Sequence, residues 1–150
     1  MNYIAPIEKK AKSRLSEIQI LVGIALKERE DWVRNKIRAR WKLGKKPDGT
    51  FIGTYSTSSM GAEYAFFKNQ INPSAGLGQV DLTLTGALGK GIKISSFNDK
   101  AEIYSTDEKY DDIVSKYGDY NFNITEEEEN ELFTYIYDDI NTKLLNYIYG

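Results

Sequence analysis

Two kinds of segment in this sequence carry residue types that could do chemistry: one glycine-rich stretch and several carboxylate clusters. The stretch DLTLTGALGKGIKI (81–94) contains Gly-Lys-Gly, which raises the question of a phosphate-binding loop. That loop requires G-x-x-x-x-G-K-[ST], because its backbone N–H groups surround the phosphates and the hydroxyl binds magnesium. Here Leu84 occupies the first glycine position and Gly91 the hydroxyl position. The dinucleotide fingerprint G-x-G-x-x-G also fails, at Ile94. The stretch therefore predicts a short extended segment, a glycine turn and a strand, rather than a nucleotide site.

The carboxylate clusters are Glu126–Glu129, Asp111-Asp112 and Asp138-Asp139. Glycosidase chemistry needs two carboxyl groups that face one another across a cleft. Adjacent residues point apart on a helix, so we interpret the pairs as solvated helix faces. The glutamate run matches the positive end of a helix dipole. A small carboxylate-dependent enzyme stays open as an alternative, but we expect no catalytic, cofactor-binding or metal-ligating set and no cofactor.

The composition excludes many kinds of site. The 150 residues include neither cysteine nor histidine. Disulfides, thiol nucleophiles, zinc sites of the usual ligand type and Ser-His-Asp triads are therefore excluded. The side chain best suited to titrate near neutral pH is missing as well. The length is that of one domain, 1–150, and the residue types favour a protein that is not an enzyme.

The most apolar segment is IQILVGIAL, at 18–26. A membrane-spanning helix needs about 20 apolar residues, so we interpret this segment as a buried helix and expect no membrane contact. The N-terminal residues lack the apolar stretch of a signal peptide. The sequence therefore predicts synthesis in the cytoplasm.

Charge is distributed unevenly along the chain. Residues 1–46 hold 13 Lys/Arg and 5 Asp/Glu, a net charge of +8, whereas residues 47–150 hold 7 and 17, a net charge of −10. A chain polarised in this way can attract a copy of itself. We predict that the basic first helix of one copy contacts the acidic C-terminal region of a neighbour, and that salt weakens this assembly.

Hydrophobic periodicity predicts an α+β fold: a long N-terminal helix, a small antiparallel sheet with a hairpin, a short helix, and a C-terminal helix packed on one face. Apolar residues three and four apart extend the first helix over about 7–41, and Pro47-Asp48-Gly49 predicts a turn after it. The capping box Thr125–Glu128 begins the last helix. The remaining expected elements are an extended loop or arm at about 50–79 with a strand in 51–55 and a short helix in 60–69, a hairpin at about 91–105, a helix at 108–117 and a C-terminal helix at about 125–149.

The chain is rich in tyrosine, with eleven in all. Tyrosine is enriched at protein interfaces, because it buries a large area while it keeps a polar group. On the last helix the tyrosines fall on more than one side, whereas a single-domain core would bury one stripe. Together with the charge pattern, this favours a homo-oligomer. The subunit-interface candidates are Arg34, Arg38, Arg40, Tyr135, Tyr137, Tyr147 and Tyr149.

Several short motifs occur in a recognisable order. They are KPDGTFIGTYS (46–56), DLTLTGALGKGI (81–92), AEIYS (101–105), KYG (116–118) and NITEEEENELFTYI (123–136). In this order the chain resembles the tailed-phage neck and tail-completion proteins, a family of small virion-morphogenesis proteins that join the head connector to the tail. The chain departs from the family pattern at Gly89, where a second basic residue is usual, and at Asp119-Tyr120, which follow the aromatic-glycine pair.

The resemblance implies a structural virion protein without catalytic residues. Its copies would form a ring in the phage neck, and its partners would be the portal or connector and tail proteins. DNA that passes through the ring would be a further, non-specific contact. The location that the resemblance implies is the virion neck or tail.

A second class of function, nucleic-acid binding, rests on the segment WVRNKIRARWKLGKK (32–46). A basic helix with aromatic residues can bind phosphates and stack on bases. Here Trp32, Ile37 and Trp41 fall on the apolar face of the predicted helix. The tryptophans are therefore expected in the core or an interface rather than on bases.

Overall fold

The chain is described by a computed structural model that covers residues 4–97 and 100–149. Within these residues the chain forms helices and one two-stranded antiparallel sheet, so the predicted α+β class is confirmed. The helices are α1 (Ile4–Glu28), α2 (Glu30–Lys42), α3 (Ser59–Ile71), α4 (Ala87–Lys90), α5 (Tyr110–Tyr117) and α6 (Glu126–Tyr149), with single 3-10 turns at Pro73–Ala75 and Asp119–Phe122; the strands are β1 (Ile92–Phe97) and β2 (Lys100–Ser105).

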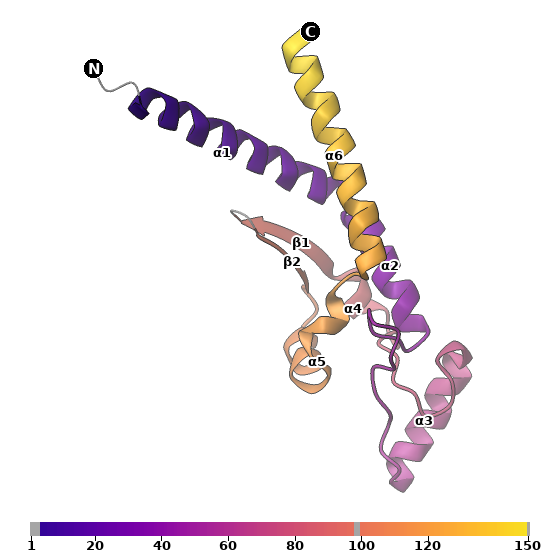
Figure 1. Cartoon of the computed structure of the whole chain (residues 1–150). Coiled ribbons are helices and arrows are strands. Elements are labelled where there is room, and N and C mark those ends of the chain that lie inside the picture. The colour runs from indigo at the N-terminus through magenta and orange to yellow at the C-terminus, as the bar shows by residue number, and fades with distance from the viewer. Residues whose placement is uncertain (1–3, 98–99, 150) are drawn as a thin grey trace.

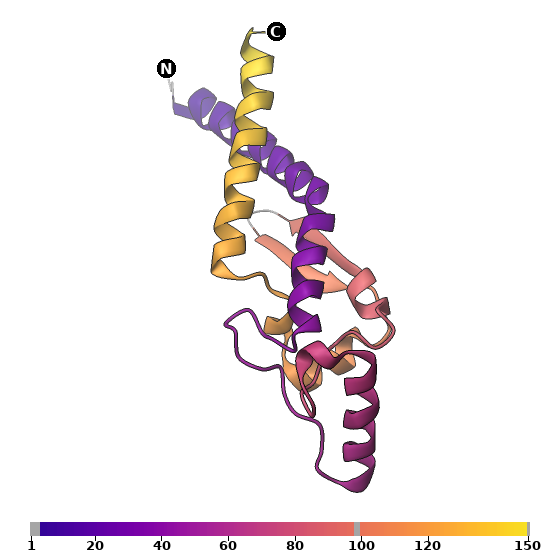
Figure 2. The ribbon, with the colours of Figure 1, turned by 90° about the vertical axis from the view of Figure 1, so that its right-hand side faces the viewer.

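The elements form a small central body from which three helices project. Figure 1 shows the hairpin, α2, α4 and α5 in the middle, with the first turns of α1 and the last turns of α6 extending from one end. The helix α3 lies at the opposite end, and the quarter-turn view in Figure 2 shows the same separation. The two ends of the chain therefore lie on the same side of the body.

The predicted long helix is wrong in one respect, because it is divided at Arg29. The Arg29 N–H donates to the Leu26 carbonyl at 3.1 Å, a three-residue turn that interrupts the α-helical pattern. Gly23, a residue of low helix propensity, stays inside α1. A Cβ atom there would lie 2.7 Å from the Ser96 Oγ atom. Glycine at this position lets the strand β1 approach the helix closely.

The core lies between α2, the hairpin and the segment before α6. Val33, Ile37 and Trp41 are fully buried, at the spacing of one helix face. The Trp41 ring packs edge-on against Phe122 at 5.0 Å, and its Nε1–H donates to the Asn121 carbonyl at 2.9 Å. The tryptophan is thus a core residue, as the periodicity predicts.

The expectation that 18–26 forms a buried helix is only partly confirmed. Ala25 and Leu26 are buried, but Ile18, Ile20 and Ile24 are exposed. Among the described residues, β1 and α6 pack on part of the second half of α1, and these three isoleucines stay exposed to water. On the sheet, Ile92, Ile94 and Ser105 are buried and Ile103 is half-buried, whereas Ala101 is exposed.

The prediction of a loop over 50–79 is partly wrong. It contains α3, which is longer than the short helix expected there, and Ser58 begins it by accepting from the Gly61 N–H at 3.2 Å. The strand expected in 51–55 is reduced to isolated bridges, Lys45 with Phe51 and Thr54 with Gln79. A turn does follow the first helix as expected, since the Gly49 N–H donates to the Lys46 carbonyl at 3.0 Å.

The glycine-rich stretch is structural. Residues 80–86 form an irregular link, and α4 is a single turn that leads into β1. A Cβ atom on Gly89 would lie 2.8 Å from the Arg38 Cγ atom, so this glycine allows α4 to pack against α2. The glycine at position 89 is therefore explained by the close contact between α4 and α2 and not by a nucleotide-binding loop.

The capping box at the start of α6 is confirmed. The Thr125 Oγ1 atom accepts from the Glu128 N–H at 3.1 Å, and the Glu128 carboxylate accepts from the Thr125 N–H at 2.9 Å. The hairpin is confirmed too, with Ile94 paired to Ile103; residues 98–99, between its strands, lie outside the described residues. The helix expected at 108–117 begins two residues later, at Tyr110.

Candidate subunit interface

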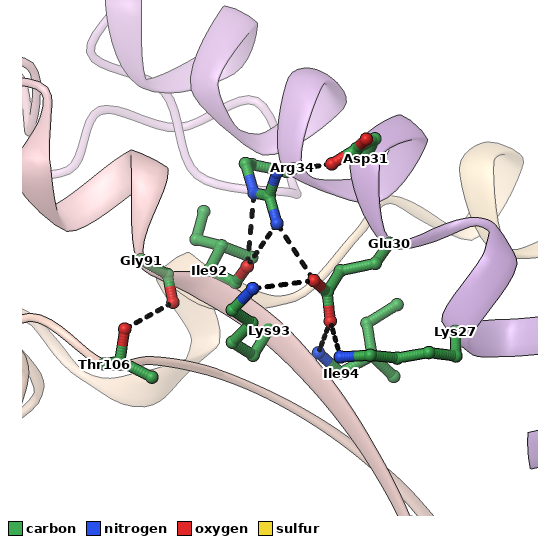
Figure 3. Close-up of polar contacts among 9 residues, drawn as sticks. All are labelled: Lys27, Glu30, Asp31, Arg34, Gly91, Ile92, Lys93, Ile94 and Thr106. Atoms are coloured by element: carbon green, nitrogen blue, oxygen red, sulfur yellow. Dashed lines mark hydrogen bonds and ion pairs between the residues drawn. The ribbon is translucent and has the colours of Figure 1, made fainter.

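Arg34 lies where α2 meets the free edge of β1, and its partners belong to its own chain (Figure 3). Its Nε and Nη2 atoms each donate to the Ile92 carbonyl at 3.2 Å, and Nη2 lies 3.0 Å from Glu30 Oε1. A further ion pair joins Arg34 to Asp31. Only 18 % of the Arg34 side chain is exposed. This arginine satisfies a strand edge that β2 leaves unpaired, and it is not free to contact a neighbour.

Glu30 is the acidic centre of the same cluster. Its carboxylate accepts from the Ile94 N–H and from Lys93 Nζ, each at 3.1 Å, and pairs with Lys27. Burial alone would raise the pKa of Glu30, but the hydrogen bonds from Lys27, Ile94 and Lys93 lower the pKa to about 2. The ionised carboxylate therefore ties the helix junction to the sheet.

Arg40 joins α2 to the beginning of α6. Its Nη1 atom lies 3.3 Å from Glu128 Oε2, and its Nη2 atom donates to the carbonyls of Asn121 and Asn123. Burial lowers the pKa of Arg40, and the nearby Glu128 carboxylate opposes that shift. The Nε atom is buried and has no hydrogen-bond partner among the described residues. The Glu128 side chain thus takes part in both the capping box and this ion pair. Arg40 therefore stabilises the fold of its own chain.

The charge polarity of the sequence is largely matched inside one chain. Besides the Arg40 pair, three ion pairs connect α1, α2 and the junction between them with α6: Lys36–Glu131 at 3.3 Å, Arg29–Asp139 at 3.3 Å and Lys143–Glu28 at 3.5 Å. These partly exposed pairs each contribute at most about 1 kcal/mol. The contact between basic first helix and acidic C-terminal region, which the sequence predicts between copies, exists here within a single copy. Uneven charge is therefore no longer an argument for assembly by itself.

Arg38 differs from the other two candidate arginines. It is exposed, and no ion pair or hydrogen bond of its guanidinium occurs among the described residues. With Lys42, one turn later, it lines a shallow cavity of about 360 Å³ that Ile71, Leu82 and Thr83 also border. This is the outer basic face of α2, directed away from α6.

The tyrosine candidates divide in the same way. Tyr135 packs edge-on against Trp32 at 6.2 Å, lies under the Arg29 guanidinium at 5.0 Å and donates to Glu131 at 3.0 Å. Tyr137 is 58 % exposed and touches an aromatic neighbour on its own helix. Tyr135 is therefore mainly a packing residue, whereas Tyr137 is available to a partner. The side chains of Tyr147 and Tyr149 lie outside the described residues.

A buried ion pair that sequence reasoning missed anchors α3. Lys68 Nζ contacts Asp81 Oδ1, and both side chains are almost completely buried. Asn72 adds a hydrogen bond from Nδ2 to Asp81 Oδ2 at 2.9 Å, and Thr83 donates its hydroxyl to Oδ1 at 2.8 Å. Burial would raise the pKa of Asp81, but the hydrogen bonds from Lys68, Asn72 and Thr83 lower it. No periodic signal links residues 68 and 81, so only the fold could reveal the pair.

Large apolar side chains are exposed on the three projecting helices. The chain exposes 10380 Å² of surface, whereas a compact monomer of 17.1 kDa exposes about 7,800 Å². The excess of about 2,600 Å² is comparable to an obligate interface. The exposed apolar residues on these helices include Leu15, Ile18, Ile20 and Ile24 of α1, Met60, Tyr64, Phe66, Phe67 and Ile71 of α3, and Phe133, Tyr137 and Leu145 of α6.

The α3 residues among them were not predicted as interface candidates. Their signal in the sequence is MGAEYAFFKNQI, which is apolar without a single helical stripe. Such a pattern is typical of a helix covered on more than one side.

The carboxylate clusters do not assemble into a site. Within the described residues, no group of three or more metal-ligating side chains converges. Asp139 pairs with Arg29, and Asp111, Asp112 and Asp138 are exposed. In the same part of the chain, no helix combines the length and apolar character needed to cross a membrane.

Comparisons of the chain with protein-family models, with curated proteins and with solved structures find no match.

Proposed function

We propose that this protein is a structural component of a tailed-phage neck, where copies of it form a ring between the head connector and the tail. The observation that carries the proposal is the excess of exposed surface, about 2,600 Å² per chain relative to a compact monomer. That surface is apolar on α1, α3 and α6, the three helices that leave the body. A chain of this kind is stable in water mainly when copies or partners cover those helices.

The motifs behind the family resemblance occupy positions that shape the fold, which supports the proposal. The KPDG segment makes the turn after α2. The KYG segment ends α5 at Gly118, and the NITEEEE segment supplies the capping box of α6. Motifs at turns and caps suit a structural family, because such a family retains a shape rather than a reactive group.

Native mass spectrometry and negative-stain electron microscopy of the purified chain test the proposal. We expect closed rings of identical copies, since heterologous contacts that repeat around an axis close only at a fixed number. A monomer at every concentration and salt condition would contradict it. A turnover activity toward any small substrate would contradict it as well.

A second candidate, contact with DNA, is favoured by one observation. Arg38 and Lys42 form an exposed basic face on α2 without anionic partners among the described residues. Phosphate contacts by such side chains are independent of base sequence and weaken steeply with salt. We expect a short duplex to be retained at low salt by the wild type and lost in Arg38→Glu/Lys42→Glu. Absence of retention at low salt would reject this candidate.

A further inference from the structure

A groove opens along one side of the core, between β2 and α6. Its volume is about 820 Å³. Leu26, Ile94 and Leu132 form its floor, and Ile103 and Phe133 lie on its walls. The floor residues belong to the core itself, so the core is open to water along this line. An apolar groove of this size accommodates one face of a helix rather than a small polar ligand.

The rim of the groove is acidic. Glu102, Asp119, Glu126 and Glu129 line it, and each of these residues is exposed. None of the four forms an ion pair with a described residue, in contrast to the α6 carboxylates that face α2. Burial raises the pKa of Tyr110 at one end of the groove, and the charges of Glu102 and Asp119 raise it further. A partner for this groove therefore needs apolar side chains flanked by positive charge.

The first half of α1 has these properties. The sequence places Lys9, Lys10, Lys12 and Arg14 there. Leu15 and Ile18 follow and are 57 % and 42 % exposed. In Figure 1 this half extends away from the central body.

The helix cannot reach its own groove. Because α1 is continuous to Glu28, and its Leu26 already lies in the groove, Leu15 is about 16 Å farther along the same axis. The groove of one chain is therefore open to the α1 helix of another.

The other occupants fit the groove less well. Helix α3 exposes apolar residues, but Lys68 is the only basic residue between Ser59 and Ile71, and it is buried against Asp81. A nucleic acid would meet the four rim carboxylates and be repelled. Among the described parts of the three projecting helices, α1 alone joins exposed apolar side chains to a run of basic residues in the sequence.

We propose that the groove between β2 and α6 binds the first half of α1 from a second copy of this chain. The inference rests on the proposed function, since it supplies the contact from which a ring is built. Each copy gives one helix and receives one, which is a heterologous contact and closes after a fixed number of subunits. A helix face in such a groove buries about 800 Å² on each partner, so one donated and one received helix account for a large part of the excess surface.

The lack of cysteine in the natural sequence allows a direct test. Leu15→Cys and Phe133→Cys are prepared as separate variants, mixed, and treated with a short bis-maleimide linker. Both positions are exposed, so the single-chain fold is expected to survive. We expect cross-linked dimers in the mixture and few in either variant alone. Met60→Cys, at the exposed end of α3, is the matched control and is expected not to link to Phe133→Cys.

Charge reversal supplies a second readout. Lys12→Glu or Glu129→Lys alone is expected to weaken association about fivefold, and the two together to recover most of it. Lys90→Glu carries the same charge change on α4, away from the groove, and is expected to leave association unchanged.

The outcomes separate this inference from the proposed function. Rings that form without a Leu15–Phe133 cross-link, or that ignore the charge reversals, overturn the α1 contact and leave the neck function standing. Cross-linking of Leu15→Cys to itself alone overturns it too, because that result indicates a symmetric α1–α1 contact. A chain that stays monomeric throughout overturns the contact and the function together.

Discussion

Two regions of the molecule differ in how their side chains are covered. One is the side of α2 that faces α6, and the other consists of the projecting helices α1 and α3. On the α2–α6 side, Arg29, Lys36 and Arg40 each pair with a carboxylate of the same chain. On the projecting helices, apolar side chains such as Ile24 and Phe66 face water. In the first region the charges are paired within one copy, and in the second the apolar side chains are uncovered. The comparison teaches that charge in this chain stabilises the body, whereas the uncovered apolar surface is where we propose that partners bind.

Disrupting the buried Lys68–Asp81 pair is expected to have the largest effect on stability, because this pair anchors the projecting helix α3 to the body. Asp81→Ala leaves the Lys68 ammonium buried without a partner, and we expect a loss of about 3–5 kcal/mol in unfolding free energy. Urea denaturation measures it. In the double variant Lys68→Met/Asp81→Leu more than half of this loss is expected to be recovered, since no buried charge remains. A loss below about 1 kcal/mol for Asp81→Ala would show that α3 is not held by this pair.

The contribution of the Glu30 cluster to the stability of the body is expected to depend on pH. The folded-state pKa of about 2 lies below the ordinary value of 4.5. Its stabilisation is therefore present above about pH 4.5 and is lost as the pH falls toward 2. We expect about 2 kcal/mol from it, less than the full shift implies, because Lys27 and Lys93 are partly exposed.

Urea unfolding at pH 6 and pH 3 of the wild type and of Glu30→Gln measures this contribution. The wild type is expected to lose more stability across that interval than the variant. Parallel losses in the two proteins would mean that the cluster does not depend on ionised Glu30.

The capping box gives a smaller effect on the same side of the molecule. Thr125→Ala removes the oxygen that accepts from the Glu128 N–H, and we expect a loss of about 1 kcal/mol in thermal or urea unfolding. Thr134→Ala is the matched control, since its hydroxyl only donates to the Asn130 carbonyl within the helix. Equal losses of stability in the two variants would contradict a specific contribution of the capping box.

The projecting helix α3 gives the smallest effect. Met60→Ser and Phe66→Ser are expected to change the unfolding free energy of the single chain by no more than about 0.5 kcal/mol, because both side chains lie in water. The measurement is urea unfolding at a concentration at which the chain is monomeric. A loss above 1 kcal/mol would mean that these residues pack within the chain and that the two regions are not opposites.

Local signals predicted the elements well where the cause is local. The capping box, the hairpin and the buried stripe of α2 each depend on residues a few positions apart. The division at Arg29 was missed, because Glu30 is drawn toward β1 by partners more than sixty residues away. Among the interface candidates, Arg38 and Tyr137 are free for a partner, while Arg34, Arg40 and Tyr135 serve the fold.

The sequence by itself determined the α+β composition, the start of α6, the core face of α2 and the absence of thiol and imidazole chemistry. These follow from residue type and from periodicity along one helix. Only the tertiary structure decided which charged side chains pair within the chain and which apolar helix faces remain exposed to solvent. A charged residue or a leucine is the same in the sequence whether it is paired or exposed. Its role depends on whether a segment distant in the sequence packs against it.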